Sequence, residues 1–172
     1  MKPKFAAVAA LILLAVGAAL ILRTLPDARA EREFGQLRDL LETKGTQASP
    51  AELADAFSGI AGIGDDRLLE LVEKNVRSED PLRRSAALQI VGGLPHIPDR
   101  LPTAGLTSEA FEAEISSALQ AKESVERGSG IFAAQGLASI EPHRAALEVI
   151  AERDTDHVLR ELARATLDGL HR

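Results

Sequence analysis

The side chains that most often carry enzyme chemistry are few in this sequence and are not grouped. The chain has four histidines, His96, His143, His157 and His171, and no cysteine. It contains no His-x-x-x-His pair and no repeated His-Glu pair, so the spacing of a helical metal site is missing. We expect His143 and His157 to lie exposed in the first turns of helices. We expect His171 near a helix end, where its charge would favour the dipole.

Two other patterns superficially suggest ligand or acid–base sites. Gly59, Gly62 and Gly64 have the spacing of a phosphate loop, but they follow a helix and lack a Lys-Ser/Thr ending, so helix termination is expected. The acidic segments 65–66 and 154–156 each begin a helix, where capping is the default role of Asp. No Gly-x-Ser-x-Gly turn is present, although the sequence leaves open a Ser–His–Asp arrangement made by the fold. We therefore expect no catalytic, cofactor-binding or metal-binding residue, no cofactor, and no enzyme.

Charge and aromatic content argue against a nucleic-acid partner. The chain carries 20 Lys and Arg against 26 Asp and Glu, a net charge of −6. Binding to phosphates requires clustered basic side chains, and no basic run is present. The five Phe, with no Trp or Tyr, also give few platforms for stacking bases.

The elements that position these side chains start with an apolar N-terminal segment. Residues 5–22 carry no charged or polar side chain. As a helix they would span about 27 Å, close to the hydrocarbon thickness of a membrane. Lys2 and Lys4 precede this run, which predicts a cytoplasmic N-terminus and a periplasmic or other extracytoplasmic C-terminal domain at the inner membrane. The alternative is a signal peptide cleaved at Ala30, which would release the protein into the periplasm.

The rest of the chain is predicted to form helices only. Apolar residues recur at helical spacing and no strand-length alternation appears, so we divide the chain into an anchor with linker (1–30) and an all-α domain (31–172). Ser49 and Glu52 predict a capping box around Pro50. The expected helices are 31–44, one starting after Ser49 and closing at Gly62, one starting at Asp65 or Asp66 and including Val76, one from Asp80 to Gly92–Gly93, one from Thr107 or Ser108, and 123–138, 141–152 and 155–170.

An internal repeat relates these helices. Alignment of the segment DPLRRSAALQIVGGL (80–94) with DHVLRELARATLDGL (156–170) pairs Asp80 with Asp156 and Arg84 with Arg160. A degenerate middle copy places Arg127 opposite Arg84. The intervals along the chain from Arg84 to Arg127 and from Arg127 to Arg160 bracket the usual length of a two-helix repeat.

At these residues the sequence resembles HEAT-like repeats of the PBS-lyase type. The stretch from Asp80 to Leu88 is similar to the second helix of such a repeat, Asp-Pro-x-Val-Arg-x-x-Ala. The resemblance covers 65–172 and implies a short α-solenoid, a right-handed superhelix of antiparallel helix pairs. It also implies an Asp–Arg ladder between inner helices, and its members here are Asp80, Arg84, Asp156 and Arg160. Most HEAT-like arrays bind proteins, and a minority are lyases or metal-dependent hydroxylases.

The segment 94–107 interrupts the repeat with three prolines and several apolar residues, and connections of this length in compact folds are often functional. It could equally pack its apolar side chains over helix ends. Arg83, Arg84 and Arg100 would make its surroundings basic. The residues we expect to contact a protein partner are Arg84, Ile97, Arg100, Leu101 and Arg160.

These observations predict a membrane-anchored extracytoplasmic module for protein–protein interaction, a scaffold or adaptor. Its partners would be a protein, held by the helical domain, and the membrane, held by residues 5–22. No small-molecule substrate is identified. The alternatives are a subunit of a membrane complex recognised through its anchor, and a small extracytoplasmic ligand-binding or enzymatic helical domain.

Overall fold

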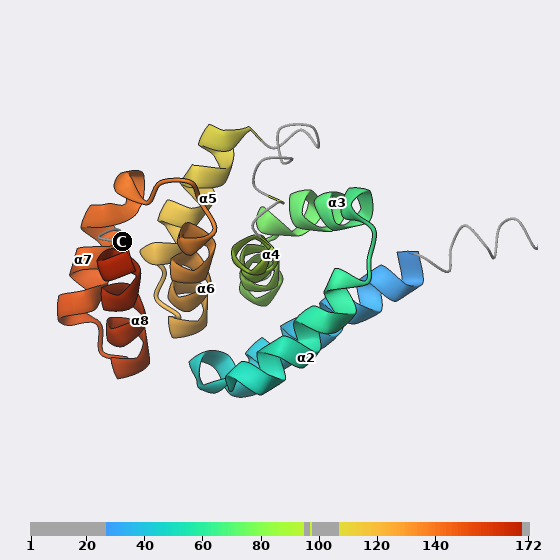
Figure 1. Ribbon diagram of the computed structural model, residues 1–172, viewed down its shortest axis with the longest axis horizontal. Coiled ribbons are helices and arrows are strands. Elements are labelled where there is room, and N and C mark those ends of the chain that lie inside the picture. The colour runs from blue at the N-terminus through green and yellow to red at the C-terminus, as the bar shows by residue number, and fades with distance from the viewer. Residues whose placement is uncertain (1–26, 95–96, 98–106, 170–172) are drawn as a thin grey trace, which may run out of the picture.

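The computed structural model describes residues 27–94, 97 and 107–169. All regular secondary structure within these residues is helical, as predicted, and none of their helices is long and apolar enough to cross a membrane. The apolar run 5–22 lies outside them. The elements are the first helix (27–44), η1 (Gly45–Gln47), α2 (Pro50–Ala61), α3 (Asp65–Val76), α4 (Pro81–Gly93), α5 (Ser108–Leu119), α6 (Ser124–Gln135), η3 (Glu141–His143), α7 (Arg144–Arg153) and α8 (His157–Asp168) (Figure 1).

Side-chain caps fix several of the predicted helix starts. Ser49 and Glu52 form the expected capping box at α2: the Ser49 hydroxyl accepts from the Glu52 N–H, and the Glu52 carboxylate accepts from the Ser49 N–H at 2.9 Å. Asp80 caps α4 by accepting from the Leu82 N–H, and Asp156 caps α8 in the same way. These bonds satisfy backbone donors that the first turn of a helix leaves unpaired.

Other boundaries differ from the prediction. Gly64, and not Asp65 or Asp66, is the N-cap of α3, so both aspartates lie in its first turn, where the helix dipole stabilises carboxylates. The sixth predicted helix ends earlier, at Gln135, and the seventh begins with the short 3-10 turn η3. Helix ends of this kind depend on local backbone geometry that residue types specify only weakly.

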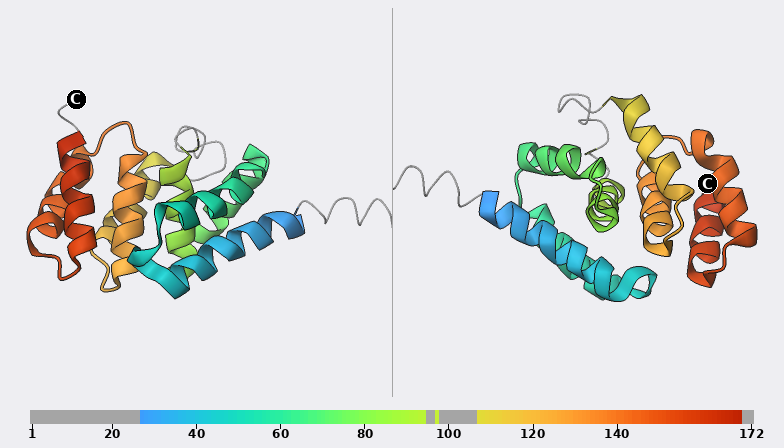
Figure 2. Two further views of the ribbon diagram at one scale, coloured as in Figure 1. Left: turned by 60° about the horizontal axis from the view of Figure 1, so that its bottom comes forward. Right: turned by 180° about the vertical axis from the view of Figure 1, so that it is seen from behind.

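The first helix and α2 run antiparallel and form a helical hairpin, here called the N-terminal hairpin (27–61) (Figures 1 and 2). The chain is already helical at Asp27, earlier than the predicted start at residue 31. Gly59 of α2 and its C-cap Gly62 face the ends of the Glu33 and Arg29 side chains of the first helix. The apolar stripe of the first helix is buried in the core: Ala30, Phe34, Leu37 and Leu41.

The remaining helices pack in three successive pairs, α3–α4, α5–α6 and α7–α8, and in Figure 1 α4 is seen end-on beside α3. Figure 2 shows the pairs from two further sides. The second helices of the pairs lie next to one another in the order α4, α6, α8, and α4 packs on α6 more extensively than α6 packs on α8. The N-terminal hairpin crosses beneath this row. One continuous apolar core joins the hairpin to all three pairs.

The tight α4–α6 contact depends on glycine. A Cβ at Gly92 of α4 would overlap the backbone carbonyl of Phe132, and a Cβ at Gly136 would lie 2.9 Å from the Val91 carbonyl oxygen. Gly128 and Gly130 of α6 also lie close to neighbouring elements: Gly128 to Leu159 of α8, and Gly130 to Leu119 of α5. Backbone atoms cannot move aside as a side chain can, so Gly92 has no tolerated replacement.

Replacement of Gly92 by Ala therefore should destabilise the fold by roughly 1–3 kcal/mol, the usual cost of overpacking. Gly35→Ala in the first helix is the matched control, because nothing lies within 4 Å of a Cβ at that position. It should stabilise the protein by about 0.5–1 kcal/mol through helix propensity. Urea unfolding followed by circular dichroism measures both. Equal effects of the two substitutions would contradict the close helix contact.

Candidate functional site

Three arginines occupy equivalent places in the three helical pairs. Arg84, Arg127 and Arg160 are each the fourth residue of the second helix of a pair. Each guanidinium donates through Nη1 to the backbone carbonyls six and five residues earlier, in the connection that precedes its own helix. The donor distances to the carbonyl six residues earlier are 2.7, 2.9 and 2.6 Å. The sequence alignment of these arginines thus corresponds to one repeated backbone contact.

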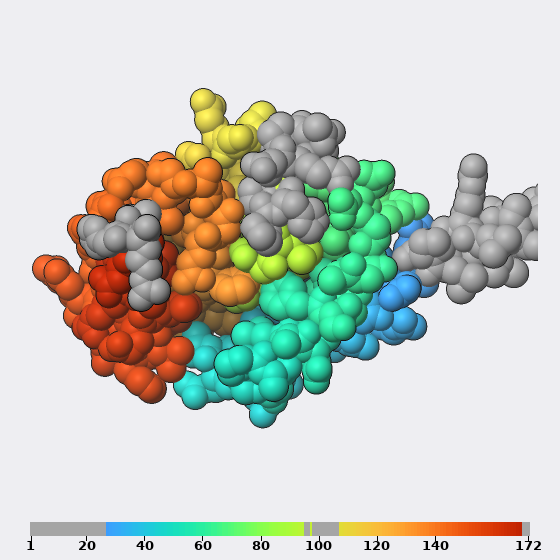
Figure 3. Space-filling view, in the orientation of Figure 1, coloured from blue at the N-terminus to red at the C-terminus, as the bar shows by residue number. Residues whose placement is uncertain are grey.

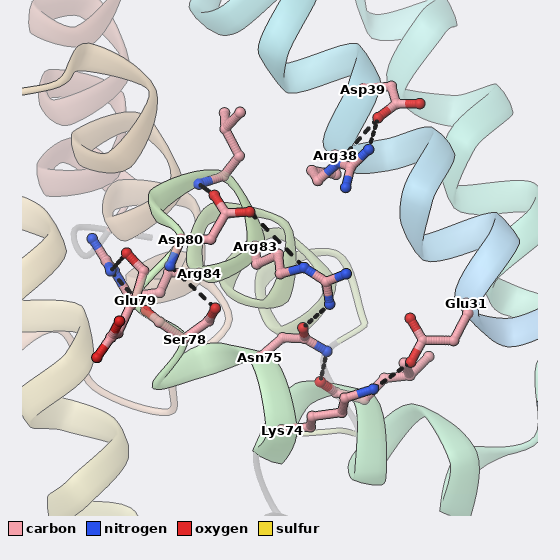
Figure 4. A network of polar contacts seen from close by, with 12 residues as sticks. Glu31, Arg38, Asp39, Lys74, Asn75, Ser78, Glu79, Asp80, Arg83 and Arg84 are labelled. Atoms are coloured by element: carbon pink, nitrogen blue, oxygen red, sulfur yellow. Dashed lines mark hydrogen bonds and ion pairs between the residues drawn. The ribbon is translucent and has the colours of Figure 1, made fainter.

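Figure 4 shows this contact in the first pair. Arg84 points toward Ser78 and Glu79, while the adjacent Arg83 points the opposite way and donates to Asn75 Oδ1 at 3.0 Å. The buried Asn75 in turn donates to the Leu71 carbonyl. Arg83 and Arg84 are therefore both held by acceptors of their own helical pair, and Arg100, the third arginine of the predicted basic surroundings, lies outside the described residues.

Ion pairs connect successive pairs, with partners that differ from the expected Asp–Arg ladder. Arg84 contacts Glu126 of α6 at 2.5 Å, and Arg127 binds Asp154 through two bonds of 2.6 and 2.9 Å. Asp80 and Asp156 instead cap their own helices. The hydrogen bond from Arg127 holds the pKa of Asp154 below its usual value, because it favours the charged carboxylate. The link between the second and third pairs is thus a charge-assisted, largely buried pair.

Of the five predicted partner-binding residues, the structure describes Arg84, Ile97 and Arg160. Arg84 and Arg160 are partly buried against backbone carbonyls. Ile97 is 0% exposed and belongs to the core, so its side chain offers no contact surface, contrary to expectation. Its burial matches the alternative that the connection packs over helix ends. Arg100 and Leu101 lie outside the described residues.

The prediction that His143 lies on the surface is wrong. His143 is only 1% exposed, and its Nδ1 lies 3.2 Å from the Ser116 hydroxyl of α5. Its Nε2 is buried and finds no hydrogen-bond partner among the described residues. Desolvation lowers the pKa of His143, and the Glu112 carboxylate partly offsets this effect. His143 therefore connects η3 to α5 in the protein interior, and its ring is not exposed to solvent. His157 is exposed, as predicted.

The most distinctive surface feature lies between the second and third pairs. Val149 of α7 is 57% exposed, and among the described residues it is the only large apolar side chain so exposed. It borders an open cavity of about 560 Å³, here called the Val149 groove, with Ala145 and Ala146 beside it and Arg153 at its edge. The Arg153 side chain is exposed, and its closest carboxylate contact is Glu152 at 4.0 Å. The groove thus combines an apolar floor with an accessible positive charge.

The corresponding space between the first and second pairs has another character. That cavity, about 530 Å³, is lined by charged side chains, including Arg84, Glu114, Lys122 and Glu126. The positive and negative charges of these side chains offset one another. No group of His, Cys, Asp or Glu with metal-binding geometry occurs in the described part of the chain. Sequence reasoning missed the Val149 groove, although Val149 could have been noticed as an apolar residue off the buried stripe formed by Leu147 and Ile150.

The Arg127–Asp154 pair should contribute a large coupling energy to stability. In a double-mutant cycle with Arg127→Met and Asp154→Asn, we expect a coupling of roughly 1–3 kcal/mol, because the pair is bidentate and shielded from water. The exposed pair Arg164–Glu161 is the matched control and should give a coupling near zero. Chemical denaturation of the four proteins of each cycle provides the measurement. A coupling near zero at Arg127–Asp154 would contradict this account of the third pair's attachment.

His143 should make stability sensitive to mild acid. In the unfolded chain its imidazole takes up a proton near pH 6.5, whereas the folded protein binds that proton only at lower pH. The free energy of unfolding should therefore fall as the pH drops through about 6.5. His143→Gln should remove this step, and His157→Gln, at an exposed site, should leave it in place. Denaturation midpoints between pH 8 and pH 5 measure it, and a step unchanged in His143→Gln would rule out His143 as its source.

Comparison with known proteins gives no relative for this arrangement. Neither a protein-family model, nor a curated protein, nor a solved structure matches the chain.

Proposed function

We propose that this chain is a membrane-anchored, extracytoplasmic protein-interaction module, in which a short HEAT-like right-handed solenoid presents a groove to a protein partner. The repeated contact of Arg84, Arg127 and Arg160 supports the repeat architecture. In each pair the arginine at the same position of the second helix donates to the backbone carbonyl six residues earlier. The observation that carries the binding function is the Val149 groove. An exposed apolar side chain over a cavity marks an interaction surface more often than a scattered surface residue does.

The chemistry of the groove specifies its partner. Ala145 and Ala146 leave room for an apolar side chain beside Val149, and Arg153 offers an exposed cation whose ion pair with the exposed Glu152, at 4.0 Å, is weak. The complementary partner is a protein segment with an apolar anchor next to an acidic residue. Desolvated apolar anchors supply most of the energy of such contacts, and the charge at the edge adds specificity.

The N-terminal residues of the described part support an uncleaved anchor. Ala30 is 3% exposed and lies inside the first helix. Cleavage after Ala30 would remove this buried residue and also Asp27, which forms an ion pair with Arg67 of α3 at 2.9 Å. Residues 5–22 then act as the single transmembrane anchor, with the N-terminus in the cytoplasm and the helical domain in the periplasm. The mass of the protein extracted from membranes tests this directly.

The partner test uses the full-length protein cross-linked in native membranes. We expect Val149→Asp to reduce the yield of the cross-linked partner at least about tenfold, because it places a charge where an apolar side chain must be desolvated. The carboxylate introduced by Val149→Asp would lie one helical turn before Arg153. The attraction between these opposite charges favours the helical state of α7. Ala165→Asp, at an exposed position of α8, is the matched control and should retain the partner.

Two further variants distinguish the alternatives. Leu101→Asp tests the 94–107 connection, and loss of the partner only in this variant would move the contact there. Exchange of residues 5–22 for an unrelated apolar helix tests recognition through the anchor. If only this exchange abolishes the complex, the chain is a subunit held by its anchor and the groove proposal is wrong.

A further inference from the structure

The α7 helix carries opposite charges on the two flanks of Val149. At about 3.6 residues per turn, Glu148 and Glu152 share one flank of the helix. Ala146 and Arg153 share the other flank and line the Val149 groove. Both glutamates are exposed and lie outside the lining of the groove. The exposed face of α7 thus runs from an acidic edge, over Val149, to a basic edge that borders the groove.

The position of α7 leaves this face accessible. The third pair forms one end of the described molecule, and α7 lies at the left edge of Figures 1 and 3. Within the described residues α7 packs chiefly on α8, with smaller contacts to α5 and η3, and the side chain of Val149 remains 57% exposed. A second molecule can therefore reach Val149 without displacing a described helix.

A second copy of this chain offers the occupant that the groove requires. The groove takes an apolar anchor beside an acidic residue, and in α7 the exposed Glu148 directly precedes Val149. Among the described residues Val149 is the only large apolar side chain so exposed, so it is the one anchor that the described part of the chain can supply. In a twofold arrangement the same patch lies on both sides of the contact, and each copy covers the Val149 of the other.

The charges of α7 select how two copies pack. When two α7 helices lie parallel, related by a twofold axis that runs along them, the acidic edge of each helix faces the basic edge of the other. Glu148 of one copy then lies opposite Arg153 of the other, the kind of ion pair that flanks the apolar seam of parallel coiled coils. In an antiparallel arrangement like edges would face each other, which is unfavourable. The parallel arrangement also brings the two Val149 side chains together at the axis.

We propose that the Val149 groove binds a second copy of this chain, with α7 packed in parallel on α7 so that Val149 meets Val149 and Glu148 meets Arg153. This inference rests on the proposed function, because it names the partner of the groove described there. The α7 helix has only 10 residues, so the contact belongs to the small, weak class of interfaces. Joint anchorage in one membrane raises the local concentration of the two chains and favours such a contact.

The first test uses the absence of cysteine from the chain. Val149→Cys introduces a single thiol at the proposed axis, and mild oxidation of native membranes that contain the full-length protein should join two copies by a disulfide. Ala165→Cys, at an exposed position of α8, is the matched control. It should give at least about tenfold less disulfide-linked dimer, because two thiols bond only when their backbones lie close together. Equal dimer yields from the two positions would overturn the proposal.

An exchange of charges tests the arrangement of the two helices. In the Val149→Cys background, Arg153→Glu and Glu148→Arg should each lower the yield of dimer at least about fivefold, since like charges would then meet across the contact. Co-expression of these two variants should restore the yield, because opposite charges meet again, and recovery also shows that both are folded. Arg164→Glu on the exposed surface of α8 is the control and should leave the yield unchanged. No recovery on co-expression would contradict the parallel contact.

The identity of the captured protein separates this inference from the proposed function. Mass spectrometry of the cross-linked complex that Val149→Asp abolishes should find only this chain. If the complex holds a different protein and Val149→Cys gives no disulfide-linked dimer, the groove remains a partner site and the second copy is refuted as its occupant. If Val149→Asp abolishes no complex, the proposed function and this inference fail together.

Discussion

The backbone carbonyl groups in the short connection between the two helices of each pair are the constraint on which this architecture depends. These carbonyls lie outside the helices and lack intrahelical donors, and a carbonyl that loses water without gaining a donor costs free energy. Arg84, Arg127 and Arg160 meet this need with a guanidinium placed one turn into the following helix. The same charge is favoured by the dipole of the preceding helix. One residue type at one position thus ties the connection to the second helix in all three pairs.

Arg127 differs from its two counterparts because its ion pair with the following pair of helices, to Asp154, is bidentate. Arg84 also reaches the following pair, through Glu126, and there the α4–α6 contact is closed by glycines as well. The α6–α8 contact is less extensive than the α4–α6 contact. Arg127 and Asp154 both line the Val149 groove, so the ion pair that holds the third pair in place also forms part of the wall of the proposed partner site.

The helices, most caps and the equivalence of the three arginines could be predicted from sequence, because each depends on residues close together in the chain. Ser49 with Glu52, and Asp80 with Leu82, are local pairs of this kind. The burial of His143 could not be predicted, since it depends on α5, with Ser116 27 residues away. The ladder was assigned the wrong acids for the same reason: Glu126 and Asp154 become partners only when successive pairs stack.

The N-terminal hairpin determines how the proposed anchor would hold these sites. Ion pairs Asp27–Arg67 and Glu31–Lys74 fasten the start of the first helix to α3, and Phe34 and Leu37 fix the same helix in the core. Residues 23–26 between the apolar run and Asp27 reach at most about 14 Å even when fully extended. With residues 5–22 in the membrane, the domain is therefore held close to the bilayer by a helix that belongs to its own core. A partner of the proposed module would then meet the domain next to the bilayer, on a face that the first helix holds in a fixed orientation to the rest of the core.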